Sequence, residues 1–279
     1  MRRSSVSGAL LAALRHVLLT AGAVVMVAPF VLMVSLSLKP PAEIFAGEWR
    51  LLPETWYAWE NYSAAFTRQP LARYIGNGFL VTFGIFTGQM LTAVPCAYAL
   101  AKLRWRGRET VFALVLLGLM IPHQVTAIPL YIAMWKLGLL NTYAAVILPS
   151  TISVFGIFLL RQFFKTVPDD LIHAARLDGL GEFAIVWRIM LPTAMPALVA
   201  FGLLSFVWNW NEFFWPLIVV QSERLATPPL GILFFSNQEA GTNYGLLMAA
   251  AVAVNAPLLV AFLFAQRRFI EGVTMTGVK

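Results

Sequence analysis

The sequence predicts an all-α membrane protein that crosses the bilayer with six transmembrane helices. Hydrophobic residues make up 59% of the 279 residues and charged residues only 12%, whereas soluble proteins have about 45–50% and about 25%. Five long segments contain no Asp, Glu, Lys or Arg, and a sixth contains only Glu212. Because about 20 apolar residues cross a bilayer as a helix, these segments exclude a soluble globule.

The six predicted spans follow one another along the chain. The first follows a basic segment, as the apolar part of a signal peptide does, but its uncharged run exceeds the about 7–15 residues typical of such a signal. We therefore expect a retained helix. Glu212 costs the fifth span about 3 kcal/mol, which its other apolar residues offset. The predicted spans are 17–38, 74–101, 110–135, 143–160, 190–220 and 245–265.

The basic residues predict the orientation, because Lys and Arg gather in cytoplasmic loops. Of the 20 Lys and Arg residues, 14 fall on the side of the two termini. Both termini are therefore predicted to be cytoplasmic, with 1–16 as the N-terminal segment, 17–265 as the transmembrane domain and 266–279 as the tail. The basic residues are scattered among apolar runs, so we expect contact with membrane lipid and no nucleic-acid partner.

Two outer loops differ in character. The first, 39–73, contains five Trp and Tyr residues, as expected for a segment that lies along the membrane interface; an aromatic platform for a sugar is the alternative. The last outer loop, 221–244, is long and polar enough to contact a partner outside the cell. Its candidate contact residues are Asn237, Gln238 and Asn243.

The loop 161–192 between the fourth and fifth spans is fairly polar and predicts a rigid projection. Pro168 suits the start of a helix, and the acidic pair Asp169 and Asp170 suits the positive end of the helix dipole. Asp178-Gly179 predicts a sharp end to that helix, and a second helical stretch begins at 182. Ala174 and Ala175 leave one face with little side-chain bulk, where a partner could pack closely. A plain solvated loop is the alternative.

The pattern of this loop resembles a known family. Ala174-Ala175, Asp178-Gly179 and Leu191-Pro192 are similar to the EAA loop of ABC-importer permeases, and MIPHQVTAIPLY at 120–131 and WNWNEFFWPL at 208–217 extend the resemblance. The chain is thereby identified as a member of the carbohydrate-uptake type 1 permeases, of the kind represented by maltose permease protein G and glycerol-3-phosphate permease protein E. The resemblance implies the type I ABC importer permease fold.

The resemblance also implies the function and the partners. It implies a subunit that moves a sugar or related solute across the inner membrane by alternating access, as a heterodimer with a second permease. Two copies of a cytoplasmic ATPase subunit, which carry the ATP and Mg²⁺, and an extracytoplasmic binding protein complete the assembly. The residues implied to contact the ATPase are His173, Ala174, Ala175, Asp178, Gly179 and Gly181. His173 departs from the family, which usually has Glu there.

The source of energy leaves an alternative open. No lysine follows a glycine, so the chain lacks the P-loop that would bind ATP, and no catalytic residue is expected. An ion-coupled secondary carrier would need an ionisable residue inside the membrane, and Glu212 is the candidate. A membrane scaffold that recruits a partner through 161–192 is a third possibility.

Polar residues within the spans are candidates for the solute pathway. They can line a lumen, or they can bond to neighbouring helices. The candidates are Gln124, Asn209, Asn211, Glu212 and Asn255. No metal site is expected, because His16, His123 and His173 lie in separate segments and Cys96 is the only cysteine.

Overall fold

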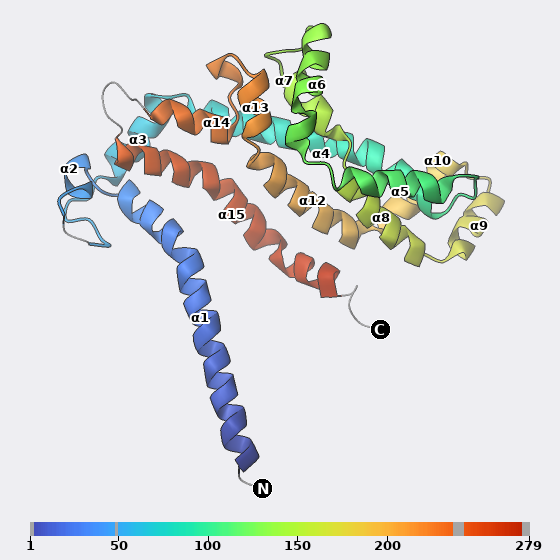
Figure 1. Ribbon diagram of the computed structural model, residues 1–279, viewed down its shortest axis with the longest axis horizontal. Helices are drawn as coiled ribbons and strands as arrows, with labels where there is room; N and C mark the ends of the chain where they lie inside the picture. The colour runs from blue at the N-terminus through green and yellow to red at the C-terminus, as the bar shows by residue number, and fades with distance from the viewer. Residues whose placement is uncertain (1–2, 48–49, 237–242, 275–279) are drawn as a thin grey trace. The chain divides into compact units, whose positions relative to one another are not determined.

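The protein is all-helical in the computed structural model, which describes residues 3–47, 50–236 and 243–274, with side chains from 11 to 263 within those ranges (Figure 1). No β-strand occurs in these ranges, which confirms the predicted fold class. The helices are α1 (Arg3–Ser37), α2 (Pro41–Ile44), α3 (Ala58–Thr67), α4 (Leu71–Ala101), α5 (Arg108–Gly118), α6 (His123–Lys136), α7 (Tyr143–Ile147), η1 (Leu148–Thr151), α8 (Val154–Thr166), α9 (Asp169–Leu177), α10 (Glu182–Ile185), the π-helix η2 (Val186–Met190), α11 (Leu191–Thr193), α12 (Met195–Trp210), α13 (Phe214–Val219), η3 (Glu223–Leu225), α14 (Pro228–Ile232), η4 (Leu233–Phe235) and α15 (Tyr244–Thr274).

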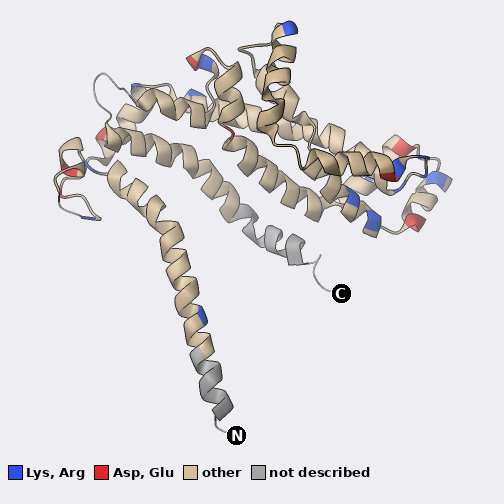
Figure 2. Ribbon diagram, in the orientation of Figure 1, with Lys and Arg blue, Asp and Glu red and all other residues tan. Residues whose placement is uncertain are grey.

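The membrane-spanning segments are of two kinds. Three helices are long and apolar enough to cross a bilayer by themselves, at Leu11–Ser37, Leu71–Ala101 and Tyr244–Leu263. Three pairs of shorter helices pass the same test only together, and each pair is bent at a short break. The total is six if each bent pair is one span, as the sequence predicts. Figure 2 shows that charged residues lie mainly at helix ends and in loops.

The predicted third span, 110–135, is not one straight helix. It is divided into α5 and α6, which meet at an angle of 98°. Pro122 is in an extended conformation at the start of α6, with φ of −60° and ψ of 131°. Proline has no backbone N–H to donate and disfavours helical geometry in the residue before it, here Ile121. The helical pattern of apolar residues continues through the break, so it gave no sign of the bend.

The predicted fourth and fifth spans are also broken. The fourth bends by 40° between η1 and α8. The fifth bends by 83° between α11 and α12, where Pro192 and Pro196 flank the break. It also ends earlier than predicted, because α12 stops at Trp210 and a separate helix, α13, follows. Asn211 and Glu212 therefore lie in a break and not within a continuous helix.

The chain forms two compact units. The first contains residues up to Leu71 together with Ile232–Asn255, and the second contains Ala72–Gly231 and the residues from Ala256. In the first unit, the buried Asn61 amide donates to the carbonyls of Ser37 and Lys39, each at 2.9 Å. These bonds hold α3 against the end of α1. The segment that precedes α3 exposes Trp56, as the predicted interfacial loop requires.

The second unit is organised around two apolar clusters. One lies between α4, α6, α7 and α13, where the indole N–H of Trp215 donates to the Ala145 carbonyl at 2.9 Å. The other joins α4, α5 and α8 to the segments from α9 to α12. Gly156 permits close packing of α8 against α12, because a Cβ atom at this position would lie 2.6 Å from the ring of Phe201. The loop after α8 is thus folded onto the same core as the spans.

Candidate functional site

The helix, turn and second helix predicted within 161–192 are present, although the first residues of that range belong to α8 (Val154–Thr166). Pro168 precedes α9, whose first turn carries Asp169 and Asp170 and whose last turn carries Arg176. Acidic residues at the N-terminus and a basic residue at the C-terminus both complement the helix dipole. We call α9, the turn 178–181 and α10 the knob.

The knob owes its sharp turn to Gly179. This residue has φ of 81°, a left-handed conformation that glycine adopts without the steric cost paid by other residues. The N–H of Gly179 donates to the Arg176 carbonyl and the N–H of Leu180 to the Ala175 carbonyl, both at 3.0 Å. These two bonds form a Schellman motif. The Asp-Gly pair therefore ends α9 as predicted, and α10 begins after Gly181.

Apolar packing fixes the inner face of the knob. Ile172 and Ala175 are 2% and 3% exposed and belong to the same core cluster as Tyr98 of α4. A rigid connection to the spans follows, because displacement of α9 would expose this packed surface to water. The knob can therefore transmit a movement to the helices that carry it.

Polar contacts add to this connection. The hydroxyl of Tyr98 donates to one oxygen of the Glu182 carboxylate at 2.5 Å. The Arg176 guanidinium donates to the other oxygen at 2.7 Å. These two bonds tie the end of α9 and the start of α10 to α4. Glu182 is thus a positioning residue for the knob, although it lies outside the predicted contact set.

An ion pair holds the start of the knob. The ammonium group of Lys102 donates to the Val167 carbonyl and to the Asp169 carboxylate, both at 2.5 Å. This hydrogen bond and the positive charge of Lys102 hold the pKa of the Asp169 carboxyl below its ordinary value of 3.8. Asp169 is therefore ionised at neutral pH, and the pair joins α9 to the segment after α4.

The predicted contact surface of the knob is wrong in one residue, Ala175. His173 and Ala174 are exposed, but Ala175 is turned into the core, so its side chain is not available to a partner. The reason is helical periodicity: Ala175 lies three residues after the buried Ile172 and shares its face. The prediction treated the two alanines as one surface, whereas only Ala174 belongs to it.

Three large apolar side chains on the knob are exposed and lie outside the predicted contact set: Leu171, at 46%, and two that are exposed further. Leu177 is 89% exposed and Phe183 is 72% exposed. The helical periodicity that places Ile172 and Ala175 inside also places Leu177 outside. The exposure of Leu177 could therefore have been predicted from the spacing alone. Large exposed apolar side chains beside a small one are typical of a surface that a partner covers.

The structure brings two helix breaks together in the candidate pathway. His123 lies at the start of α6, and its Nε2 is 3.7 Å from the Glu212 carboxylate, which lies between α12 and α13. A second oxygen of Glu212 accepts a hydrogen bond from the backbone N–H of Trp215 at 3.0 Å. Glu212 therefore caps α13. His123 is absent from the predicted set, although the adjacent Pro122 marks the break.

Asn209 lies in a buried polar network. Its amide donates to the carbonyl and the hydroxyl of Ser205, at 2.7 and 3.1 Å. The Ser205 hydroxyl donates to the Gln89 side-chain carbonyl at 2.6 Å, and the Gln89 amide donates to the Ser150 carbonyl at 2.9 Å. Asn209 is thus bonded within α12, to the serine whose hydroxyl joins α12 to Gln89 of α4.

The other pathway candidates are dispersed. Gln124 is exposed in the first turn of α6, and Asn211 is exposed at the end of α12. Asn255 lies in α15 and donates to the carbonyl of Ala251, one turn earlier, at 2.8 Å. In the ranges that the structure describes, no group of three or more His, Cys, Asp or Glu side chains could hold a metal ion.

The last outer loop is held by asparagines that the sequence analysis did not single out. The Asn77 amide donates to the carbonyls of Arg224 and Ala226, at 3.0 and 2.8 Å. Asn141, with φ of 57°, accepts the backbone N–H groups of Gln221 and Ser222, both at 3.0 Å. The beginning of the loop is therefore a fixed structure.

The predicted contact residues of that loop are only partly described. Asn237 and Gln238 lie outside the described residues. Asn243 precedes α15, and its side-chain oxygen accepts the backbone N–H of Leu246 at 3.1 Å. It therefore helps to start the last long helix.

Comparisons with known proteins agree on one family. Residues 89–274 match the profile of the family described as "Binding-protein-dependent transport system inner membrane component". The arabinooligosaccharides transport system permease protein AraQ of Halalkalibacterium halodurans is 36% identical over 260 residues, which are 92% of each chain. The sn-glycerol-3-phosphate transport system permease protein UgpE of Yersinia pestis is 31% identical over 266 residues, covering 92% of this chain and 94% of that protein.

A solved structure has the same fold. It is a chain of a bacterial ABC transporter involved in the import of the acidic polysaccharide alginate. Its TM-score is 0.84 with 24% sequence identity, and the match covers 94% of this chain and 98% of that one. At this level of identity, the likeness establishes the fold alone.

Proposed function

This chain belongs to the family of binding-protein-dependent transport system inner membrane components, and on this premise we propose how it takes part in transport. It is a permease subunit of an ABC importer, a component of transport and not an enzyme. Membership implies a partner permease, an ATPase, a solute-binding protein and a substrate of the sugar class.

We infer a heterodimer with a second permease, served by two copies of the ATPase that carry ATP and Mg²⁺. Both termini are cytoplasmic in this arrangement, and the knob then faces the ATPase. The distribution of Lys and Arg supports this orientation, because 14 of the 20 lie on that side.

The knob is proposed to receive the movement of the ATPase. The observation that carries this proposal is its two-sided construction: a buried inner face attached to α4, and an outer face with Ala174 and the 89% exposed Leu177. Because the inner face is packed and hydrogen-bonded, a displacement of the outer face moves the spans. Alternating opening of the helix bundle toward the two sides of the membrane would follow.

The outer loop 221–244 is proposed to contact the binding protein. Its fixed beginning, held by Asn77 and Asn141, supports a role as a rigid base for the residues beyond it. Asn237, Gln238 and Asn243 remain the proposed contacts.

We propose a sugar or oligosaccharide as the solute, with a polyol or glycerol phosphate as the alternative. The named relatives support both, because one is a permease for arabinooligosaccharides and the other for sn-glycerol-3-phosphate. Gln124, Asn209, Asn211, Glu212 and Asn255 remain the proposed pathway residues, and three of them, Gln124, Asn211 and Glu212, lie at the two helix breaks.

The alternative of an ion-coupled carrier is not favoured. The relatives are permease components of ABC systems. Glu212 has a local role that requires no transported ion, because its carboxylate caps α13.

Co-purification of the ATPase tests the knob. Leu177→Asp places a charge on the proposed contact surface, and we expect the affinity for the ATPase to fall roughly tenfold or more, as for the loss of a central interface residue. Leu137→Asp is the matched control, because Leu137 is also exposed, at 65%, but lies after α6. Equal recovery of the ATPase with Leu177→Asp and with the unaltered chain would rule out this surface.

A further inference from the structure

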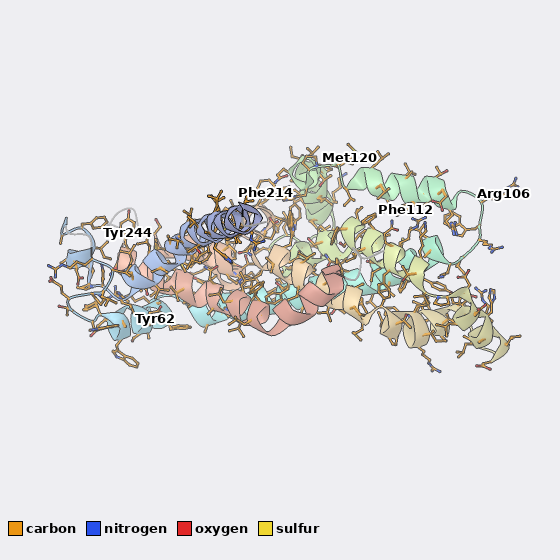
Figure 3. The ribbon with its side chains drawn as sticks, turned by 90° about the horizontal axis from the view of Figure 1, so that it is seen from below. Tyr62, Arg106, Phe112, Met120, Phe214 and Tyr244 are labelled. Carbon is orange, nitrogen blue, oxygen red and sulfur yellow. The ribbon has the colours of Figure 1, made fainter. Side chains whose placement is uncertain are left out.

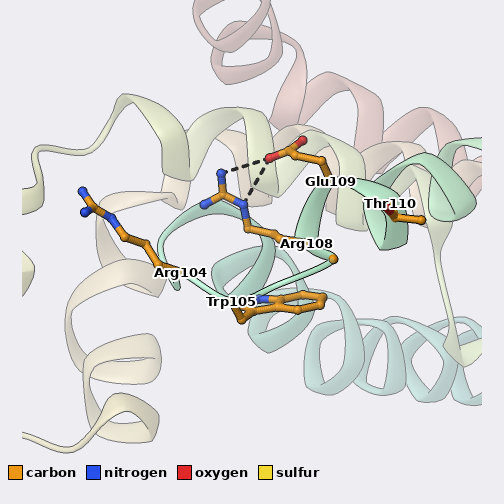
Figure 4. Close-up of a pocket in the computed structure, with 6 residues that line it drawn as sticks. Arg104, Trp105, Arg108, Glu109 and Thr110 are labelled. Carbon is orange, nitrogen blue, oxygen red and sulfur yellow. Dashed lines mark hydrogen bonds and ion pairs between the residues drawn. The ribbon is translucent and has the colours of Figure 1, made fainter.

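The segment between α4 and α5 forms a positively charged pocket that the proposed coupling does not use. The pocket has a volume of about 430 Å³ and is lined by residues 104, 105 and 107–110 (Figure 4). Its only acidic residue is Glu109. We propose that this pocket binds the phosphate group of an anionic phospholipid from the adjacent membrane leaflet.

The charge of Glu109 is already compensated. Arg161 is 2% exposed, and its Nη2 lies 3.1 and 3.0 Å from the two carboxylate oxygens of Glu109. Arg108 approaches the same carboxylate, with Nη2 at 3.0 Å from one oxygen. Arg161 is itself held by the Leu100 carbonyl at 3.0 Å and by the ring of Phe112, labelled in Figure 3, whose centroid is 3.6 Å from its central carbon.

Two further arginines lie in the same segment, and the charge of Arg104 also acts on the Asp169 carboxylate. Arg104 and Arg106 are exposed, and the ion pairs found among the described residues include neither of them. Figure 4 shows Arg104 extended away from the Arg108–Glu109 pair, and Figure 3 shows Arg106 at the tip of the loop with its side chain directed outward. Lys102 differs, because Val167 and Asp169 engage its ammonium group. The positive charge not paired with Glu109 thus comes from Arg104, which lines the pocket, and from Arg106, which lies beside the pocket in the same loop.

Trp105 gives the pocket an interfacial character. Its indole N–H donates to the Ala99 carbonyl at 3.2 Å, which fixes the ring below the pocket, and the residue is 42% exposed. Tryptophan is enriched at the level of lipid headgroups. Basic pockets beside transmembrane helices bind anionic headgroups because the opposite charges attract.

The pocket continues into an apolar surface. Thr110 lines the pocket, and Leu114 and Leu117 follow on the same face of α5 at intervals of four and three residues. Leu114 is 61% exposed and Leu117 is 55% exposed. A headgroup in the pocket would place its acyl chains along this face. This continuity favours a lipid over a soluble phosphate compound, because a soluble compound has no acyl chains to pack against the apolar face of α5.

The test measures which lipids the complete transporter retains. The complex is reconstituted in a mixture of phosphatidylglycerol and phosphatidylcholine, purified in detergent, and analysed by mass spectrometry for bound lipid. We expect phosphatidylglycerol to be enriched over the mixture. Arg104→Gln with Arg106→Gln is expected to reduce this enrichment roughly tenfold, since each basic residue near a membrane surface contributes to the attraction. Both side chains lack ion-pair partners in the described residues, so the fold should persist.

A matched double variant distinguishes a site from general attraction. Arg68→Gln with Lys136→Gln also removes two exposed positive charges, but from positions outside the segment between α4 and α5. We expect it to retain the enrichment. Equal loss in both double variants, or no loss in the pocket variant, would overturn the proposal. Displacement of the lipid by free glycerol phosphate to the level of the pocket variant would also overturn it, in favour of a soluble ligand.

Discussion

At the scale of single residues, Gly179 determines the shape of the knob. Its positive φ and the hydrogen bonds around it reverse the chain between α9 and α10. We expect Gly179→Val to destabilise the knob by about 1–2 kcal/mol, the cost of left-handed geometry in a residue with a side chain. The ATPase should then be lost on purification, while the spans remain folded.

Gly181→Val is the control for stability. Gly181 has φ of −73° and ψ of 158°, an extended geometry that suits a β-branched residue, and no atom would meet its Cβ within 4 Å. Thermal unfolding should therefore distinguish the two variants, with a lower unfolding temperature for Gly179→Val alone. Normal recovery of the ATPase with Gly179→Val would count against the importance of the turn.

The sequence predicted the turn at Asp178-Gly179 but not the burial of Arg161, because the turn is local and the burial depends on distant residues. Asp178-Gly179 is a local signal, because the turn depends on backbone geometry that these two residues favour. Arg161 gave no such signal: it reads as a cytoplasmic charge, yet it is buried between the Glu109 carboxylate and the Phe112 ring. The contact between Arg161 and Glu109 joins residues that are 52 positions apart in the sequence. Such a contact depends on how the helices pack, which a local sequence pattern does not reveal.

At the scale of elements, the two faces of α9 have different roles. Ala175 is 3% exposed and Ala174 is exposed. Ala175→Leu should overfill the core and destabilise the protein by about 1–3 kcal/mol. Ala174→Leu should leave the unfolding temperature unchanged and weaken binding of the ATPase.

The same pair of variants provides the measurement and its control. Thermal unfolding and ATPase co-purification are recorded for both, so that each substitution controls for the added volume of the other. If Ala174→Leu lowered the unfolding temperature as much as Ala175→Leu, the assignment of the inner and outer faces would be wrong.

The sequence predicted helices well where a long uncharged run was not interrupted by proline breaks or polar residues. The long uncharged runs predicted α1, α4 and α15, with close bounds for α4, whereas α1 begins earlier, at Arg3, and α15 continues to Thr274. The spans 110–135 and 190–220 were predicted as continuous, and both are broken at prolines or beside Asn211 and Glu212. Apolar composition measures how much of a segment suits the bilayer and carries no information on its direction, so the bends of 98° and 83° required the structure.

At the scale of the whole molecule, the proposed function connects the knob to the opening of the spans. The distribution of Lys and Arg predicts which side of the membrane the knob faces. The family identifies the chain as a permease component of a binding-protein-dependent transport system. The sequence alone does not identify the pathway residues, because a polar residue in a span suits both a lumen and a helix contact. Asn209 is an example, because its amide is bonded to Ser205 of its own helix, which is compatible with either role.

The central claim is that a separate ATPase drives transport through this chain. The direct measurement is uptake of a labelled sugar into liposomes that contain the complete transporter, with the binding protein outside and ATP inside. We expect uptake to require ATP and to need no ion gradient, both in the unaltered chain and in Glu212→Gln, whose amide oxygen can still accept the Trp215 N–H. Uptake driven by an ion gradient without the ATPase, and abolished by Glu212→Gln, would contradict the account.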